Sequence, residues 1–409
     1  MRKVLLLSTH DSRLGGHAWS MVEKYDKIKY DVKLVTLYSS INDKTYAIIH
    51  NYKIYKILNV IINRLSILFN FLQLNKNFSQ NKYCYLRTST FPVTAEMILK
   101  KYNNGLPDII VIHWFDGFLS PKVIRRLYEI TKAKIVFDFT DEFALGGGCH
   151  YPCECEGYKD SCKNCPALKK NKKIAESKLK EKITNLSSIP KFIIAPTAGI
   201  NKAKESRLFR SNTTFLTESE GVKLNKYYDR NETRKFFGIQ ANDFVIMFGA
   251  MNINEERKGL KLLMDSLEIL SHKIDKEIVA LVPGKINTEF QVIKNIKFKY
   301  VGFLSFEELC KAYTAADVYI SPSIADSGPM MVKYSIACGT PVVAFPIGFA
   351  IDFVKHKETG YLAEYLNIKD LANGIFYFYK YKDDRIYYRN KCLELNDKAL
   401  KNDFWGNYL

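Results

Sequence analysis

The sequence predicts an α/β fold made of two Rossmann-like domains, each a doubly wound parallel sheet. Short β-branched and apolar runs alternate with helical patterns along all 409 residues, and uninterrupted apolar runs are typical of strands buried on both faces. The runs fall into two sets, and a chain of this length accommodates two or three domains. With 47% hydrophobic and 25% charged residues, the composition is that of a globular protein rather than a disordered or collagen-like chain.

The predicted strands divide between the two halves of the chain. Five lie in the first half and five in the second: 4–7, 32–37, 108–114, 134–139 and 191–196, then 244–250, 277–284, 296–303, 317–323 and 341–345.

The core pattern is weakest at 211–223, so we place a domain boundary at residue 215. This gives domains at 1–215 and 216–395. The stretch 396–409 is helical in composition and is expected to dock back on the first domain. Because doubly wound sheets bind ligands at the carboxyl ends of their strands, we expect a site in a cleft shared by both domains.

Positive charge is concentrated in the first half. Residues 1–215 carry 35 Lys and Arg against 18 Asp and Glu, whereas 216–409 carry 26 against 25. An acidic partner is therefore expected to meet the first domain. An anionic membrane and nucleic acid are both candidates, but the sequence contains no nucleic-acid-binding motif, so we predict no nucleic-acid partner.

The sequence predicts a cytoplasmic protein. The apolar run after Lys3 is too short for a secretory signal, and 54–74 contains too many polar residues to span a membrane. Within Lys53 to Leu74 the apolar residues form one wide arc, which predicts a core-facing helix; a helix lying in a membrane interface is the alternative. Together with the Lys-rich segment 169–182, such a helix could hold the chain on the cytoplasmic face of an anionic inner membrane.

Two segments could bind a phosphate. Gly15, Gly16 and His17 follow the first predicted strand and precede a helix, where backbone N–H groups favour an anion; a plain turn is the alternative. Arg257, Lys258 and Gly259 begin a helix after a strand of the second domain. Adjacent Arg and Lys suit a diphosphate, and a solvated surface pair is the alternative.

A third segment, SPSIADSGPMMVKYSIACGTPVVAF at 321–345, makes a resemblance specific. Its turn holds Asp326, Ser327 and Gly328 before a helix. The order of RKG, VGF at Gly302, AADVYISPS and ACGTPVV resembles the donor-binding domain of glycosyltransferase family 4, which has the GT-B fold.

The first domain also resembles that family. PDIIVIHWFDGFLS at 107–120 and the following GGCHY and cysteine-rich segment resemble its bacterial capsule and exopolysaccharide branch. The resemblance implies a metal-independent, retaining hexosyltransferase that takes a nucleoside-diphosphate sugar, with UDP or GDP as the nucleotide. The polysaccharide acceptor is expected to be linked to lipid, because the basic half is also the acceptor half.

The resemblance also implies roles for single residues. Arg257, Lys258, Gly259 and Gly328 would bind the donor diphosphate, stabilising leaving-group charge without a divalent ion. Asp326, at the first acidic position of the family's Glu-x7-Glu motif, would bind sugar hydroxyls, with Ser327 and Gly302 beside the donor. His113 would lie over the reacting sugar, and Gly15, Gly16 and His17 would form the acceptor-side loop.

Tyr334 departs from the family pattern, because it stands where the second acidic residue normally contacts the ribose. A phenol cannot offer the two acceptor oxygens of a carboxylate. A non-catalytic homologue that binds another glycosyltransferase is therefore the alternative function. Nucleotide-sugar 2-epimerases share the architecture, but the sequence shows no carboxylate pair suited to that elimination.

Five cysteines lie close together at 149–165. The Cys162-x2-Cys165 spacing and two upstream thiols predict a closed, structural zinc site rather than a catalytic one. The resemblance favours Cys149, Cys155, Cys162 and Cys165 as ligands, with Cys153 as a further candidate. Free thiols or a disulfide are the alternatives.

Overall fold

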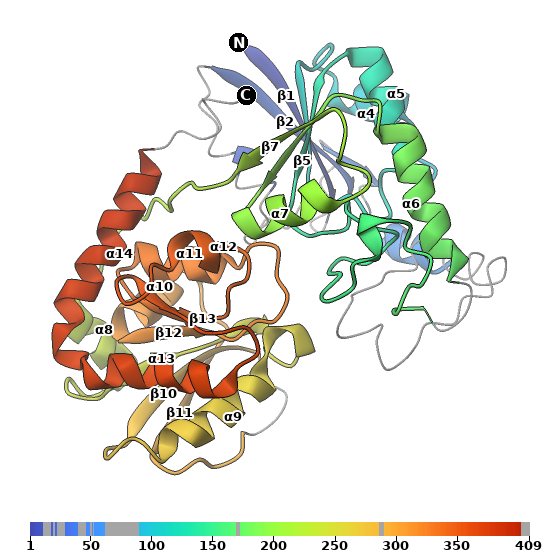
Figure 1. Cartoon of the computed structure of the whole chain (residues 1–409). Helices are drawn as coiled ribbons and strands as arrows, with labels where there is room; N and C mark the ends of the chain where they lie inside the picture. The colour runs from blue at the N-terminus through green and yellow to red at the C-terminus, as the bar shows by residue number, and fades with distance from the viewer. Residues whose placement is uncertain are drawn as a thin grey trace. The chain divides into compact units, whose positions relative to one another are not determined.

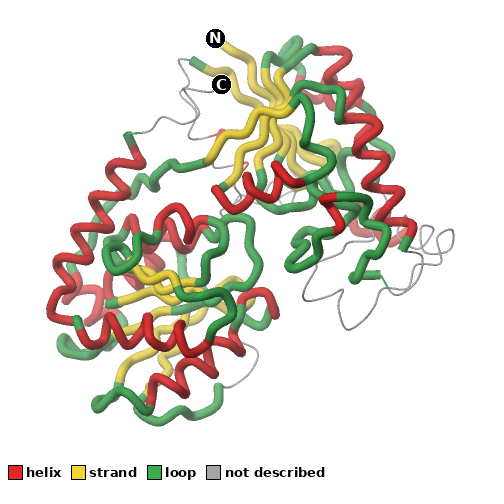
Figure 2. The backbone as a smooth tube through the Cα atoms, viewed as in Figure 1, coloured by secondary structure: helices red, strands yellow, loops and turns green. Residues whose placement is uncertain are grey.

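The chain folds into two compact units. The structure, a computed structural model, describes residues 1–10, 18, 21–22, 29–39, 46–49, 51, 53–61, 90–168, 172–285 and 290–401. Met1–Ala195 and Gly199–Thr217 form the first unit, and Pro196–Ala198 and Glu218–Leu409 form the second. Figure 2 shows that each unit is built around its own group of strands.

The first unit contains a parallel sheet whose described strands follow the order β3-β2-β1-β4-β5-β6-β7. The order reverses between β1 and β4, which pair with each other. β4 reads Ile-Ile-Val-Ile and is buried throughout, as expected for a central strand covered on both faces. The strands are β1 (Arg2–His10), β2 (Tyr30–Tyr38), β3 (Ala47–Ile49), β4 (Ile109–Ile112), β5 (Lys134–Asp138), β6 (Lys191–Ala195) and β7 (Thr213–Thr217).

Helices α4, α5 and α6 lie together along one side of this sheet (Figure 1). Local sequence explains where α5 begins, because the Ser120 hydroxyl accepts the Val123 N–H at 3.3 Å and Pro121 is the first helical residue. The helices are α4 (Ala95–Tyr102), α5 (Pro121–Thr131), α6 (Lys173–Leu186) and α7 (Thr197–Glu205), with a 3₁₀ turn at Gly157–Lys159.

The second unit contains a second parallel sheet, in which the described strands follow the order β11-β10-β8-β12-β13-β14, with β9 paired to β10. Here the order reverses between β8 and β12, which are adjacent. The strands are β8 (Val245–Met247), β9 (Ala250–Asn252), β10 (Ile278–Lys285), β11 (Ile296–Gly302), β12 (Val318–Ser321), β13 (Val342–Ala344) and β14 (Gly360–Leu362).

Helices cover this second sheet, and apolar clusters lie against it. The helices are α8 (Arg230–Phe236), α9 (Leu260–Ser271), α10 (Phe306–Ala315), α11 (Met330–Ala337), α12 (Phe349–Phe353), α13 (Ile368–Lys380) and α14 (Arg385–Leu400), with 3₁₀ turns at Glu256–Lys258 and Lys382–Asp384.

Some element predictions were wrong. The segment assigned to the domain boundary contains β7, an edge strand whose partly exposed residues give no continuous apolar run. The run 244–250 divides into β8 and β9. The C-terminal stretch does not begin a helix of its own, because Asn396 lies inside α14. Asn396 forms two hydrogen bonds with Val222 of the same unit, at 2.8 and 3.1 Å. Residues 402–409 lie outside the described residues.

The predicted apolar arc is only partly described. Residues 53–61 are helical, but Ile54, Ile57, Leu58 and Ile61 are 38–60% exposed rather than buried in a core. Residues 62–74 lie outside the described part of the chain, as does most of 11–28. Among the described helices, none is long and apolar enough to cross a membrane.

Candidate functional site

A cluster of charged side chains forms at the carboxyl edge of the second sheet. The chain leaves β9 into the turn that carries Arg257 and Lys258, and it leaves β12 into the loop that carries Asp326. Lys258 Nζ lies 2.6 Å and Arg257 Nη1 3.1 Å from Asp326 Oδ2. The Ile324 N–H donates to the Arg257 carbonyl at 2.8 Å, so a backbone bond joins the two loops.

The electrostatics of this cluster keep Asp326 ionised. Burial acts to raise the pKa of Asp326, but Lys258 and Arg257 outweigh it and hold that pKa below its ordinary value. The side chains are 10–21% exposed, so part of the cluster faces solvent. Two cations share this one carboxylate, and Arg257 also pairs with Glu255 at 2.8 Å.

Two predicted glycines shape this cluster through their backbones. Gly259 precedes α9 with a φ of 71°, and a Cβ there would lie 1.9 Å from the Pro322 carbonyl oxygen. Only glycine permits this approach of the turn to the loop after β12. The Gly328 N–H donates to Asp326 Oδ1 at 3.2 Å. Ser327, buried beside it, belongs to the same loop.

The other two predicted donor residues lie at different places in this unit. Tyr334 lies on α11 and packs edge-on against Phe306, with ring centroids 5.1 Å apart. Burial raises the pKa of its phenol, so Tyr334 is a neutral side chain at the position where the resemblance implies an acidic residue. Gly302 ends β11, which β10 separates from β8.

In the first unit, His113 directly follows β4 at the point where the strand order reverses. Its Nδ1 lies 3.1 Å from Oδ2 of Asp138, the last residue of β5. Both side chains are buried. A carboxylate beside Nδ1 can help to fix the orientation of the ring.

A second histidine, His150, lies in a buried acidic setting that the sequence prediction missed. Its Nδ1 bonds Asp141, and its Nε2 lies 3.5 Å from Asp116 Oδ2. Burial acts to lower the pKa of His150, but the two carboxylates outweigh it and raise that pKa to about 9. The ring stacks on Phe143 and packs against Trp114.

The only sequence signal for this cluster was position, since Asp116 and Asp141 each follow a strand by a few residues. The cluster brings together loops that follow β4 and β5. The predicted loop residues Gly15, Gly16 and His17 lie outside the described residues.

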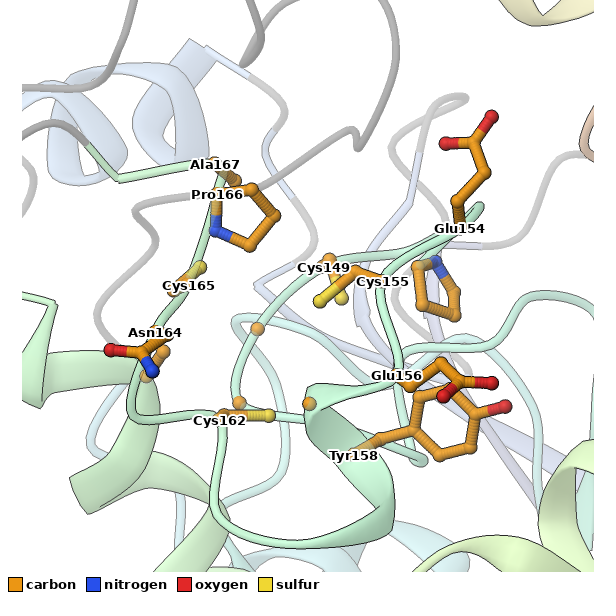
Figure 3. Close-up of a pocket in the computed structure, with 15 residues that line it drawn as sticks. Cys149, Glu154, Cys155, Glu156, Tyr158, Cys162, Asn164, Cys165, Pro166 and Ala167 are labelled. Atoms are coloured by element: carbon orange, nitrogen blue, oxygen red, sulfur yellow. The ribbon is translucent and has the colours of Figure 1, made fainter.

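The predicted metal ligands lie in the loop between β5 and α6. Cys149, Cys155, Cys162 and Cys165 line one pocket, whereas Cys153 is not among its lining residues (Figure 3). All five are free thiols in the structure.

Comparison with known proteins supports part of the predicted resemblance. Residues 229–392 match the family model "Glycosyl transferases group 1". An uncharacterised glycosyltransferase of Methanocaldococcus jannaschii is 24% identical over 148 residues, which is 35% of this chain and 37% of the relative. A D-inositol 3-phosphate glycosyltransferase of Pseudarthrobacter chlorophenolicus is 26% identical over 155 residues, or 36% of each chain. The matches thus span about a third of the length of these curated relatives.

Solved structures resemble the whole chain. A sucrose-phosphate synthase from Thermosynechococcus elongatus has a TM-score of 0.59 at 15% identity, covering 100% of this chain and 96% of its own. A glycosyltransferase from Rickettsia africae has a TM-score of 0.59 at 16% identity, covering 99% and 97%. An Anabaena protein in complex with UDP-glucose has a TM-score of 0.55 at 14% identity, covering 98% and 96%. The predicted GT-B fold with two parallel-sheet domains is therefore confirmed.

Proposed function

We propose that the protein is a glycosyltransferase that moves a sugar from a nucleoside diphosphate to an acceptor hydroxyl. The observation that carries this proposal is the Arg257–Lys258–Asp326 cluster at the carboxyl edge of the second sheet. The cluster lies at the strand reversal, where doubly wound sheets bind ligands. It also lies within the region that matches the glycosyl transferase family model.

The cluster suits a diphosphate because its cations are held ready by a carboxylate that a ligand can replace. Diphosphate oxygens would take over contacts of Lys258 and Arg257, aided by the N–H groups at the start of α9. Asp326 would then be free to accept hydrogen bonds from sugar hydroxyls. As the bond from the anomeric carbon to the diphosphate oxygen breaks, the same cations would stabilise the growing negative charge.

We assign His113 to the acceptor side of the reaction. The anomeric carbon gains a bond to the acceptor oxygen, and the hydroxyl proton leaves with the diphosphate. His113, whose Nδ1 lies 3.1 Å from Asp138 Oδ2, would act on the reacting sugar, as the resemblance implies. In line with the resemblance, we propose retention of the anomeric configuration and an acceptor of the lipid-linked surface-polysaccharide kind.

One observation supports the second candidate function, a non-catalytic binding partner of another glycosyltransferase. Tyr334 replaces the expected acidic residue, and its partly buried phenol is packed against Phe306. Tyr334 lies in the same unit as the charged cluster. Without a carboxylate at this position, one contact that would hold a nucleotide ribose is lost.

Release of nucleoside diphosphate separates the two functions. The protein is incubated with UDP- and GDP-sugars, with and without lipid-linked glycans, and the freed nucleotide is measured. The proposal predicts release that Lys258→Ala abolishes. Replacement of Lys261, an exposed lysine in the first turn of α9, by alanine is expected to leave this release intact. No release from any donor, with or without acceptor, would favour the binding partner.

A further inference from the structure

The loop between β5 and α6 gathers four thiols around one pocket of about 420 Å³. Figure 3 shows the sulfur atoms of Cys149 and Cys155 close together in the view, with Cys162 pointing toward them and the Glu154 carboxylate directed away. The fifth thiol has a different contact: Cys153 Sγ lies 3.7 Å from the Tyr151 carbonyl oxygen. The structure therefore separates one cysteine from the other four.

Two glycines show how closely these sulfurs approach one another. A Cβ on Gly146 would lie 3.6 Å from Cys162 Sγ and 3.7 Å from Cys149 Sγ. A Cβ on Gly157 would lie 3.5 Å from Cys155 Sγ and 3.6 Å from Cys162 Sγ. The Cys162 sulfur is thus near both glycines, Gly146 also lies near the Cys149 sulfur, and Gly157 also lies near the Cys155 sulfur.

The backbone near these thiols has one unusual dihedral angle and several N–H groups close to sulfur. Cys162 has a φ of 57°, a conformation that costs a residue with a Cβ about 1 kcal/mol or more and is kept where the surroundings require it. The N–H of Gly147 faces the Cys162 sulfur, and the N–H groups of Ala167 and Leu168 face that of Cys165. Burial has the larger effect and raises the pKa of both thiols, so zinc binding would have to release these protons.

A buried cation lies beside the thiols. Lys182 is 4% exposed, and its ammonium donates to the carbonyls of Phe143 and Gly146, the latter at 2.7 Å. Four thiolates around a divalent ion carry a net charge of −2, so the ammonium would offset part of that charge.

We propose that Cys149, Cys155, Cys162 and Cys165 bind one zinc ion, which closes the loop as a structural clip. Thiolates hold zinc at about 2.3 Å in a tetrahedral site, and four protein ligands leave no position for substrate. Among the described residues, no group of three or more His, Cys, Asp or Glu side chains is arranged so that it could hold a metal ion. The ion would therefore draw the sulfurs inward by rotation of the cysteine side chains.

The proposed clip stabilises a part of the loop that also holds the buried histidine cluster. His150 is the next residue after Cys149, and its ring bonds Asp141. Closing the loop would therefore fix the backbone that presents His150 to Asp141 and Asp116. The zinc proposal does not depend on the proposed transfer activity.

Metal content tests the site directly. The full chain is purified without added zinc and analysed by mass spectrometry of the elements, together with Cys162→Ser, Cys165→Ser and Cys153→Ser. We expect about one zinc per chain in the wild type and in Cys153→Ser, and a loss of at least tenfold in the other two variants. Zinc retained in Cys162→Ser and Cys165→Ser but lost in Cys153→Ser would overturn the ligand assignment.

A second measurement uses the wild type alone, in case the variants do not fold. Thiols are titrated with a mercurial while a colorimetric chelator records released zinc. The proposal predicts that zinc release accompanies modification of four thiols. Metal-free protein whose thiols react freely, protein with a Cys149–Cys165 region disulfide, or protein that holds iron in place of zinc would overturn it.

Discussion

Lys258 Nζ lies 2.6 Å from Asp326 Oδ2, so the cation that we assign to the donor diphosphate is paired with the carboxylate that we assign to the donor sugar. Lys258 comes from the turn that follows β9, and Asp326 comes from the loop that follows β12. The pair is 10–21% exposed, so a ligand can compete for it. The predictions below begin with this pair.

Removing the Lys258 charge will remove diphosphate binding. We expect Lys258→Ala to lower kcat/KM by roughly a hundredfold or more, because a preorganised cation acts on charge that develops in the transition state. Circular dichroism is expected to show an intact fold. Lys261→Ala controls for loss of a lysine from the same helix region, and equal activity of Lys258→Ala and Lys261→Ala would contradict the assignment.

Neutralising Asp326 will separate binding from turnover. Asp326→Asn removes the carboxylate that competes for Lys258 and Arg257, so free UDP or GDP is expected to bind at least as tightly as in the wild type. Transfer is expected to fall about tenfold or more, because the amide is a weaker acceptor for sugar hydroxyls. Calorimetry with the nucleotide and steady-state rates check the two parts. An unchanged turnover rate would move the sugar contact to another residue.

The Asp138 carboxylate positions His113, so its loss will act on turnover. Asp138→Asn keeps the volume but removes the charge that faces His113 Nδ1. We expect kcat to fall about tenfold or more with little change in KM for the donor, which the other unit binds. The pH profile of kcat is expected to shift as well. A variant with altered KM and an unaltered pH profile would indicate a purely structural role.

Two glycines with similar backbone angles will respond differently to alanine. Gly259 has a φ of 71° and a Cβ site 1.9 Å from a carbonyl oxygen, whereas Gly302 has a φ of 69° with nothing within 4 Å. Gly302→Ala is expected to cost about 1 kcal/mol of unfolding free energy for its backbone conformation alone. Gly259→Ala is expected to cost about 3 kcal/mol or more, because the clash adds to that term. Denaturant unfolding measures both, and equal losses would contradict the close approach.

The buried Lys191 will make stability rise with pH. Burial lowers its pKa to about 8, while the unfolded chain holds that proton until about pH 10.4. Between these values the unfolded chain binds more protons, so the free energy of unfolding increases with pH. Lys191→Met lacks this contribution. We expect the Tm of the wild type minus the Tm of the variant to increase between about pH 7.5 and about pH 9.5. A Tm difference that does not change with pH would contradict the lowered pKa of Lys191.

The central strands could be predicted because they are buried on both faces. The run at 109–112 contains only Ile and Val, so it can be recognised as a buried strand without knowing which strands lie beside it. Edge strands do not have this signal: β7 reads Thr-Thr-Phe-Leu-Thr with every residue partly or fully exposed. Sequence reasoning therefore took β7 for part of a boundary segment.

The candidate site, like the fold, could be predicted only in part from the sequence. Arg257, Lys258 and Asp326 were found because each follows a predicted strand within a recognisable motif. The pairing of Asp326 with the cations, and the meeting of His150 with Asp116 and Asp141, depend on which strands are neighbours in the sheet. That order is set by the packing of whole elements and cannot be derived from the spacing of single residues.

Binding of nucleotides to the wild type tests the central claim most directly. The Tm is measured with UDP, GDP and their common sugar conjugates, beside Lys258→Ala and Lys261→Ala. A ligand at a hundred times its Kd stabilises the native state by about 2.7 kcal/mol, so one nucleotide family is expected to raise the Tm of the wild type and Lys261→Ala but not that of Lys258→Ala. An unchanged Tm with every nucleotide, in the presence and absence of a glycan acceptor, would contradict a donor site at this cluster.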